Sequence, residues 1–156
     1  MKTIDKLLSQ YGESHQNSTN KLIHWVCVPV IMFSLVGLLM SIPFPVDKGL
    51  WSNWGSVALA LALLYYLRLS VPLFMGFLLI AAGLIYGNHA IWMAWDQSNL
   101  YLLGTSIVLF IVAWIGQFYG HEIEGKKPSF LKDVQFLLIG PAWLLHFIYR
   151  RWNIPY

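Results

Sequence analysis

The sequence contains two short polar segments that hold three of its five histidines and that could bind a metal ion. The first begins at Tyr11 and includes His15, Asn17, Asn20 and His24. Asn17, Asn20 and His24 are spaced i, i+3 and i+7, so any helix through them places all three on one face. His15 and His24 are nine residues apart, which is half a turn out of phase on an unbroken helix. They can share a site only if the chain bends between them, and the intervening polar cluster is suited to such a bend.

The second polar segment covers residues 114–128 and contains Gln117, His121 and Glu124 at spacing i, i+4 and i+7, again on one helical face. Two imidazoles and a carboxylate with open coordination positions form the facial triad of non-haem Fe(II) oxygen chemistry. Imidazole also suits zinc, so the residue types alone do not choose the metal. Amide side chains next to such histidines can fix their tautomer and ring orientation. Three amides are placed to do so here: Asn17, Asn20 and Gln117.

The remaining titratable groups near these segments have simpler explanations. His89 is expected to be a hydrogen-bonded residue near a membrane interface, while His146 is equally compatible with that role and with a metal site. Glu122 points away from the helical face of His121 and is expected to be solvated, and Glu13 is expected to be a surface charge. The pair His121-Glu122 starts like the zinc motif H-E-x-x-H, but position 125 is a glycine, so that motif is broken.

The composition indicates that these segments belong to a membrane protein. Hydrophobic residues make up 58% of the 156 residues and charged residues only 11%, whereas a soluble domain carries about 25% charged residues. Between Leu22 and Gly120 only four side chains are charged: Asp47, Lys48, Arg68 and Asp96. The single cysteine permits no intrachain disulfide. We therefore expect an integral membrane protein and exclude a nucleic-acid binder, a secreted disulfide scaffold and a disordered chain.

Four apolar runs are candidates for the membrane-spanning helices that must position the polar segments. A span needs about 20 apolar residues. The four runs are Leu22–Ile42, Leu50–Leu67, Val71–Tyr86, which can extend through Trp92, and Leu100–Tyr119. A fifth run, Val134–Ile148, is short and is interrupted at Gly140–Pro141, where proline favours a break. We predict that this fifth piece is an interfacial or re-entrant helical segment.

The first residues predict a further helix that lies on the membrane surface. Ile4, Leu7, Leu8 and Tyr11 recur at helical spacing among polar residues, as in an amphipathic helix. Asn17 and the polar residues after it are typical of a helix break followed by the cap of the next helix.

The distribution of basic residues favours four spans with both termini in the cytoplasm. Basic residues accumulate on the cytoplasmic side of short loops. With four spans, only Lys48 of the ten basic residues lies outside, and the other nine lie inside: Lys2, Lys6, Lys21, Arg68, Lys126, Lys127, Lys132, Arg150 and Arg151. A fifth span would move two of these across the membrane. The sequence thus predicts an all-α integral membrane protein with four transmembrane helices, forming one domain over residues 1–156, in a bacterial inner membrane rather than the endoplasmic reticulum.

The two polar segments resemble the signatures of the 2-hydroxy fatty acid dioxygenases. The first segment matches at His15, Asn17, Asn20, Lys21, His24 and Pro29, and the second at Trp114, Gln117, Gly120, His121, Glu124 and Pro128. Members of that family are small multi-span proteins that use Fe(II) and O2 to shorten 2-hydroxy fatty acids by one carbon. The sequence departs from the pattern at Ser129, where a small apolar residue is expected.

The resemblance implies that His15, His24 and His121 are metal-site residues, that Glu124 is a ligand or its neighbour, and that Asn20 and Gln117 orient the rings. It also implies Fe(II) as the cofactor, with a 2-hydroxy fatty acid from the lipid phase and O2 as substrates. Two other classes of function stay open. One is a non-enzymatic membrane protein that binds haem or a cation, and the other is a zinc-dependent lipid hydrolase with Glu124 as its general base.

Overall fold

The computed structural model describes residues 3–127 and 135–156, and within these residues it contains six helices and no strand. The helices are α1 (Thr3–Gly12), α2 (Ser18–Ser41), α3 (Trp54–Leu69), α4 (Val71–Ala94), α5 (Asn99–Glu124) and α6 (Phe136–Arg151). The predicted all-helical class is confirmed.

Three of these helices, α2, α4 and α5, are long and apolar enough to cross a membrane. The helix α3 has only 16 residues, and at about 1.5 Å per residue it is shorter than the hydrocarbon core of a bilayer. It starts late because Asn53 caps it, accepting a hydrogen bond from the backbone amide of Ser56. The predicted four spans are therefore not confirmed.

The outward faces of the long helices are apolar, as expected for helices that contact lipid. Leu79 on α4 is 77% exposed and Ile115 on α5 is 64% exposed. Leu61 on the shorter helix α3 is 63% exposed. Large apolar side chains exposed on neighbouring helices mark a surface that is covered by another apolar phase. These faces and the three apolar helices support a membrane protein.

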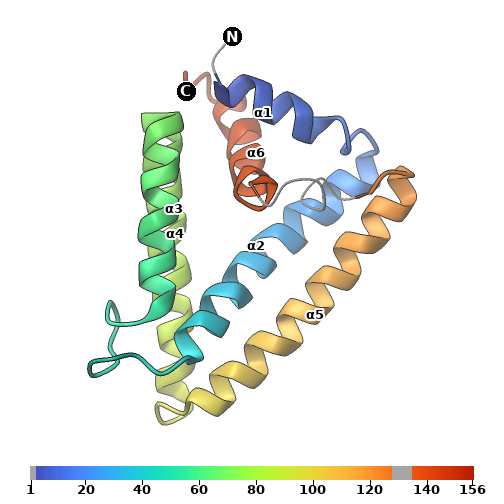
Figure 1. The fold of residues 1–156 in the computed structure, drawn as a ribbon. Coiled ribbons are helices and arrows are strands. Elements are labelled where there is room, and N and C mark those ends of the chain that lie inside the picture. Colours follow the sequence, from blue (N-terminus) through green and yellow to red (C-terminus); the bar gives the residue numbers. More distant parts are fainter. Residues whose placement is uncertain (1–2, 128–134) are drawn as a thin grey trace.

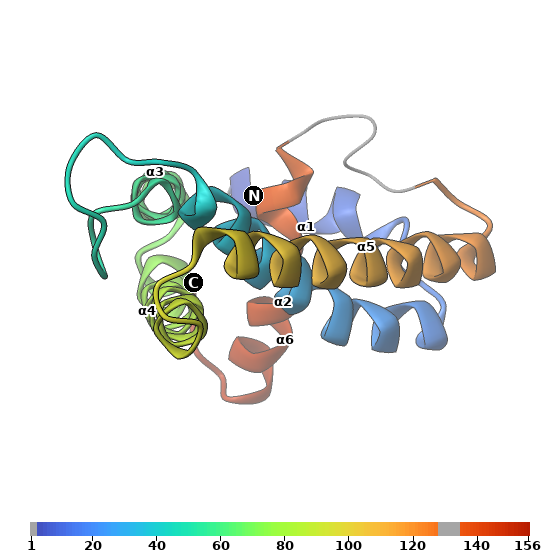
Figure 2. The same ribbon diagram turned by 90° about the horizontal axis from the view of Figure 1, so that it is seen from below.

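The helices form two antiparallel pairs, which meet at the end of the protein where α2 ends and α5 begins (Figure 1). The helices α2 and α5 lie side by side, as do α3 and α4 (Figures 1 and 2). The short helices α1 and α6 pack against each other at the end where α2 begins and α5 ends, and both termini lie at this end (Figure 1). The beginning of the chain and the last turn of α5 are thereby brought together.

The pairing of α2 with α5 depends on two small residues on α5. A Cβ atom at Gly120 would lie 2.5 Å from the side-chain oxygen of Asn20, and one at Gly116 would lie 2.7 Å from the sulfur of Cys27. Glycines four residues apart let two helices approach closely in a membrane. This approach places His121, the residue after Gly120, directly against the start of α2.

The predicted amphipathic helix at the N-terminus is present, and its apolar face packs inside the protein. Ile4, Leu8 and Tyr11 are buried, and α1 packs on α6. The side chains expected to rest on the membrane surface therefore form part of the protein core.

The predicted break at Gly140–Pro141 is wrong, because α6 continues through Pro141. The proline lies in the second turn of the helix, where its missing N–H costs one hydrogen bond. Gly140, Pro141 and Ala142 are all buried against neighbouring helices, and the hydroxyl of Tyr66 donates to the backbone carbonyl of Leu138, 2.5 Å away. Tertiary packing holds the helix together at this point.

Candidate metal centre

The connection between α1 and α2 makes the bend that the histidine spacing requires. The helix α1 ends at Gly12, and Asn17 caps α2 by accepting hydrogen bonds from the backbone amides of Thr19 at 2.8 Å and Asn20 at 3.3 Å. Its amide therefore acts on the backbone of α2 rather than on a histidine ring. The bend between the two helices turns His15 back over the first turns of α2.

Three histidines from three different parts of the chain meet at this bend. His15 comes from the connection, His24 from α2 and His121 from α5. One ring nitrogen of each lies within 4.8 Å of the other two. All three side chains are at least 95% buried. The fold therefore brings together the three histidines that the sequence predicted.

The tautomers of His15 and His24 are fixed by the backbone. The Nδ1 atom of His15 lies 2.6 Å from the carbonyl oxygen of Tyr11, and that of His24 lies 2.9 Å from the carbonyl oxygen of Asn20. A carbonyl can only accept, so each Nδ1 must carry the proton. Each neutral ring then has a lone pair on Nε2. Asn20 thus orients His24 through its main chain rather than its amide.

These two lone pairs are directed at each other. The Nε2 atoms of His15 and His24 are 2.8 Å apart, but neither has a proton to donate when both rings are neutral. Burial lowers the pKa of His15 to about 4, so this ring is neutral at pH 7. Adjacent lone pairs repel unless a cation lies near both. The geometry therefore fits a metal ion better than a hydrogen-bonded histidine pair.

His121 supplies the third nitrogen. Its buried Nδ1 atom has no hydrogen-bond partner among the described residues. A buried polar atom without a partner is costly. A ring nitrogen of His121 also lies within 4.8 Å of nitrogens of the other two rings, so the three rings together suit a transition-metal ion. The three residues therefore fit a metal, although imidazole ligands alone accommodate zinc as well as iron.

Glu124 lies near the histidines, but its carboxylate has other partners. One oxygen accepts a hydrogen bond from the backbone amide of Gln16 at 2.7 Å. The other accepts from the backbone amide of Asn17 at 2.9 Å and from the side chain of Asn20 at 3.0 Å. The last turn of α5 is thus attached to the residues that directly follow His15. The prediction that Glu124 is a metal ligand stays a prediction.

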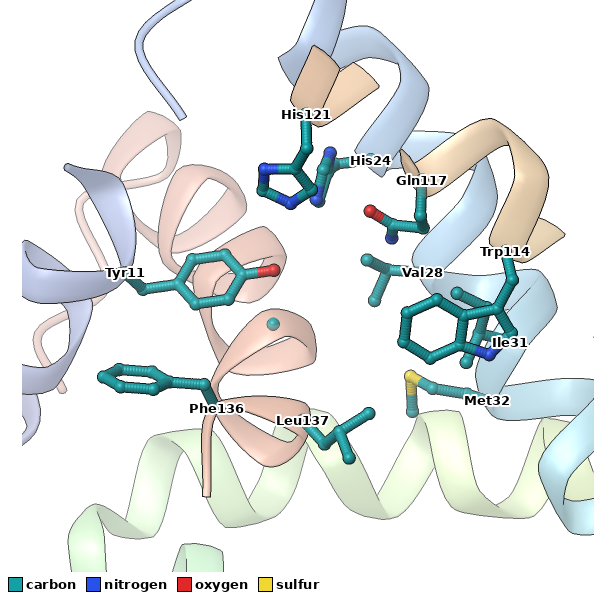
Figure 3. Close-up of a pocket in the computed structure, with 11 residues that line it drawn as sticks. Tyr11, His24, Val28, Ile31, Met32, Trp114, Gln117, His121, Phe136 and Leu137 are labelled. Carbon is teal, nitrogen blue, oxygen red and sulfur yellow. The ribbon is translucent and has the colours of Figure 1, made fainter. Parts of the chain in front are cut away.

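A cavity opens beside the histidines and is polar at one end only. His24 and His121 lie at this end, where the hydroxyl of Tyr11 and the amide of Gln117 also point into the cavity (Figure 3). Its other walls are apolar: Val28, Ile31, Met32, Trp114, Phe136, Leu137 and Gly140. The empty space within it, including the part open to its surroundings, is about 430 Å³.

The other candidate residues lie outside this cluster. His146 is hydrogen-bonded to the hydroxyl of Tyr156, and the ring of His89 lies near Trp92 on the same helix. Neither belongs to the group of three histidines found among the described residues. Glu122 and Glu13 are exposed, as predicted.

Two features of the site were not predicted from the sequence. The first is Tyr11, whose ring stacks on His15 with centroids 4.2 Å apart and whose hydroxyl faces the cavity. Its helical spacing with Ile4 and Leu8 predicted an apolar helix face, but one that lies on the membrane surface and not beside the histidines. The second is the Gly116–Gly120 spacing on α5, a pattern of small residues that predicts close helix packing.

The chain is similar to known proteins over most of its length. Residues 1–152 match the family described as 2-hydroxy-palmitic acid dioxygenase Mpo1-like. The chain is 29% identical over 153 residues to the 2-hydroxy-palmitic acid dioxygenase MPO1 of Saccharomyces cerevisiae, covering 95% of this chain and 81% of the yeast protein. No solved structure matches the chain.

Proposed function

The chain belongs to the Mpo1-like family of 2-hydroxy-palmitic acid dioxygenases, and from this membership we propose that it is an Fe(II)-dependent dioxygenase that shortens 2-hydroxy long-chain fatty acids by one carbon. The observation that carries the proposal is the buried group of His15, His24 and His121 beside a cavity with one polar end. The family description and the name of the yeast relative support the reaction class.

In this proposal the iron is bound by the Nε2 atoms of His15 and His24, which carry no proton, and by a ring nitrogen of His121, whose Nδ1 atom has no hydrogen-bond partner among the described residues. The carbonyl groups of Tyr11 and Asn20 keep the rings of His15 and His24 in the required tautomer. Fe(II) bound there would supply the activation of O2. The three side chains keep the site buried, which restricts the access of water.

Tyr11 and Gln117 are proposed to bind the polar head of the substrate. A 2-hydroxy fatty acid carries a carboxylate and an adjacent hydroxyl, and burying these groups requires hydrogen-bond partners. The phenol of Tyr11 can donate one hydrogen bond, and the amide of Gln117 can both donate and accept. Both groups point into the cavity beside the histidines (Figure 3). They would hold carbons 1 and 2 next to the metal.

Glu124 is proposed to act as a positioning residue for His15. Its carboxylate accepts hydrogen bonds from the two backbone amides that follow His15 in the chain. The carboxylate also lies at the N-terminal end of α2, where negative charge is favourable. Through these contacts it would fix the bend that places the His15 ring over His24.

Oxygen uptake tests the proposed reaction directly. Purified protein loaded with Fe(II) should consume O2 when 2-hydroxypalmitic acid is added, but not when palmitic acid is added, and should yield a product with one carbon fewer. The variant His121→Ala should lose both the iron and the uptake, while His89→Ala, a histidine outside the cluster, should keep both.

Other outcomes would support the alternative functions. If the purified protein contains stoichiometric zinc and acts on lipids without O2, it is a zinc-dependent hydrolase and not a dioxygenase. A haem absorption band in the purified protein would favour a haem-binding protein. Folded, iron-loaded protein that consumes no O2 with 2-hydroxypalmitic acid would overturn the proposed reaction.

A further inference from the structure

A second cavity lies among α2, α3, α4 and α6 and adjoins the one beside the histidines. The two cavities share three lining residues: Ile31 and Met32 of α2 and Leu137 of α6. In Figure 3, Met32 and Leu137 lie at the end of the first cavity opposite the histidines. The empty space within the second cavity, including the part open to its surroundings, is about 630 Å³.

The lining of this second cavity is suited to hydrocarbon and to little else. Among the described residues no charged side chain lines it, and Tyr66 is the one polar residue that does. The Tyr66 hydroxyl is already used, because it donates to the carbonyl of Leu138 at 2.5 Å. Tyr66 therefore presents its ring, beside the apolar side chains of Phe77 and Leu84. A polar ligand would lose its hydration here without gaining partners.

We propose that this second cavity, here termed the acyl cavity, binds the hydrocarbon tail of a 2-hydroxy fatty acid whose head group lies at the histidines. The inference rests on the proposed function, which supplies a ligand with one polar end. The order of polar and apolar groups along the two cavities matches such a molecule. The histidines, Tyr11 and Gln117 form the polar end, and Met32 and Leu137 lie between it and the apolar second cavity. A tail of many methylene groups is the part of the substrate that an apolar chamber stabilises.

The lining of the acyl cavity also identifies residues that should determine which chain lengths the protein prefers. Ala58, Ala62 and Tyr66 recur every four residues on α3 and all line the cavity. The two alanines leave space that a larger side chain would fill. Replacing Ala62 by leucine should therefore shorten the tail that fits, without contact to the histidines. Ala60 lies on the same helix outside the acyl cavity and provides the matched control.

The first test compares kcat/KM for 2-hydroxy acids of ten and sixteen carbons. Each methylene moved from water into an apolar site changes affinity by about fourfold, so Ala62→Leu should lower the ratio of the long to the short acid by about tenfold or more. Activity on the short acid shows that the variant is folded, and Ala60→Leu should keep the wild-type ratio. Ala58→Leu provides a second variant with the same expected direction. An unchanged ratio in both cavity variants would overturn the proposal.

The second test uses the wild-type chain and does not depend on turnover. Iron-loaded protein in nanodiscs, with O2 excluded, is photolabelled by 2-hydroxypalmitic acid that carries a diazirine near its methyl end. We expect labelling at side chains that line the acyl cavity, such as Ala62, Phe77 or Leu84, reduced by excess 2-hydroxypalmitic acid but not by excess palmitoyl phospholipid. Labelling confined to the outward face near Leu79, or displaced by phospholipid, would mean that the cavity does not hold the substrate tail.

The two tests separate the acyl cavity from the proposed reaction. Labelling inside the cavity that excess 2-hydroxypalmitic acid reduces, without any O2 uptake, would support the acyl cavity as the site of the tail and overturn the proposed dioxygenase reaction. Uptake of O2 with an unchanged chain-length ratio and labelling elsewhere would overturn the acyl cavity and retain the dioxygenase.

Discussion

The Nε2 atoms of His15 and His24 lie 2.8 Å apart, although each ring donates its Nδ1 proton to a backbone carbonyl. While both rings are neutral, neither can donate to the other, so the two lone pairs repel across a buried contact. This contact is unfavourable in the metal-free protein and becomes favourable when a cation lies near both atoms. Binding of a metal should therefore be coupled to the stability of the region around the bend.

Metal removal should lower the stability of the protein. A ligand that binds only the folded state stabilises it by about 2.7 kcal/mol at a hundredfold excess over its Kd. Chelation should reduce the Tm in detergent, and added Fe(II) should restore it. In His24→Ala, one lone pair is gone, so the chelator should have little effect. A Tm that chelation leaves unchanged in the wild type, with iron verified before treatment, would argue against a metal at these histidines.

Replacing Glu124 by glutamine should destabilise the metal-free protein. Glutamine keeps only one acceptor oxygen, so its NH2 group would face the backbone amide of either Gln16 or Asn17, with an expected cost of about 1–3 kcal/mol in the free energy of unfolding. Glu122 is exposed two residues earlier, and Glu122→Gln should have no such effect. Denaturant unfolding in the presence of a chelator measures both. If Glu124→Gln weakens only metal binding and leaves this free energy unchanged, Glu124 is a ligand rather than a positioning residue.

Replacing Gly120 by alanine should separate α5 from α2 and disturb the metal site. The added Cβ would lie 2.5 Å from the Asn20 oxygen, and overpacking of this kind costs about 1–3 kcal/mol. The variant should bind less iron, since His121 follows Gly120 directly. Gly104 lies on the same helix with nothing within 4 Å of its Cβ position, so Gly104→Ala should behave like the wild type. Iron content after purification compares the two, and equal content would contradict the role of the close approach.

Removing the hydroxyl of Tyr11 should weaken substrate binding while the metal stays bound. Tyr11→Phe keeps the ring that stacks on His15 but loses the group that faces the cavity. A hydrogen bond to a charged group contributes about 1.5–3 kcal/mol, so kcat/KM for 2-hydroxypalmitic acid should fall by about 10- to 100-fold. Tyr101 is exposed on α5, and Tyr101→Phe is the control. Unchanged kinetics in Tyr11→Phe would remove Tyr11 from the binding of the head group.

Local patterns in the sequence determined the helical class, the apolar runs and the residues that could form a site. Asn17 is a capping residue, so the bend between His15 and His24 could be predicted from the residues that make it. The spacing of Gln117 and His121 likewise placed both on one face of α5, because residues four apart share a helical face. Such signals work because helix periodicity and capping depend on residues within a few positions of each other.

Contacts between distant residues decided the rest. Hydropathy could not show that α6 passes through Pro141, since that depends on burial against other helices. Nor could it show that Glu124 bonds to the backbone after His15. The meeting of His121 with His15 and His24 requires α5 to pack on α2 at one register, which is fixed by the shapes of both helices. A sequence names the residues on each helical face, but only tertiary packing selects which faces meet.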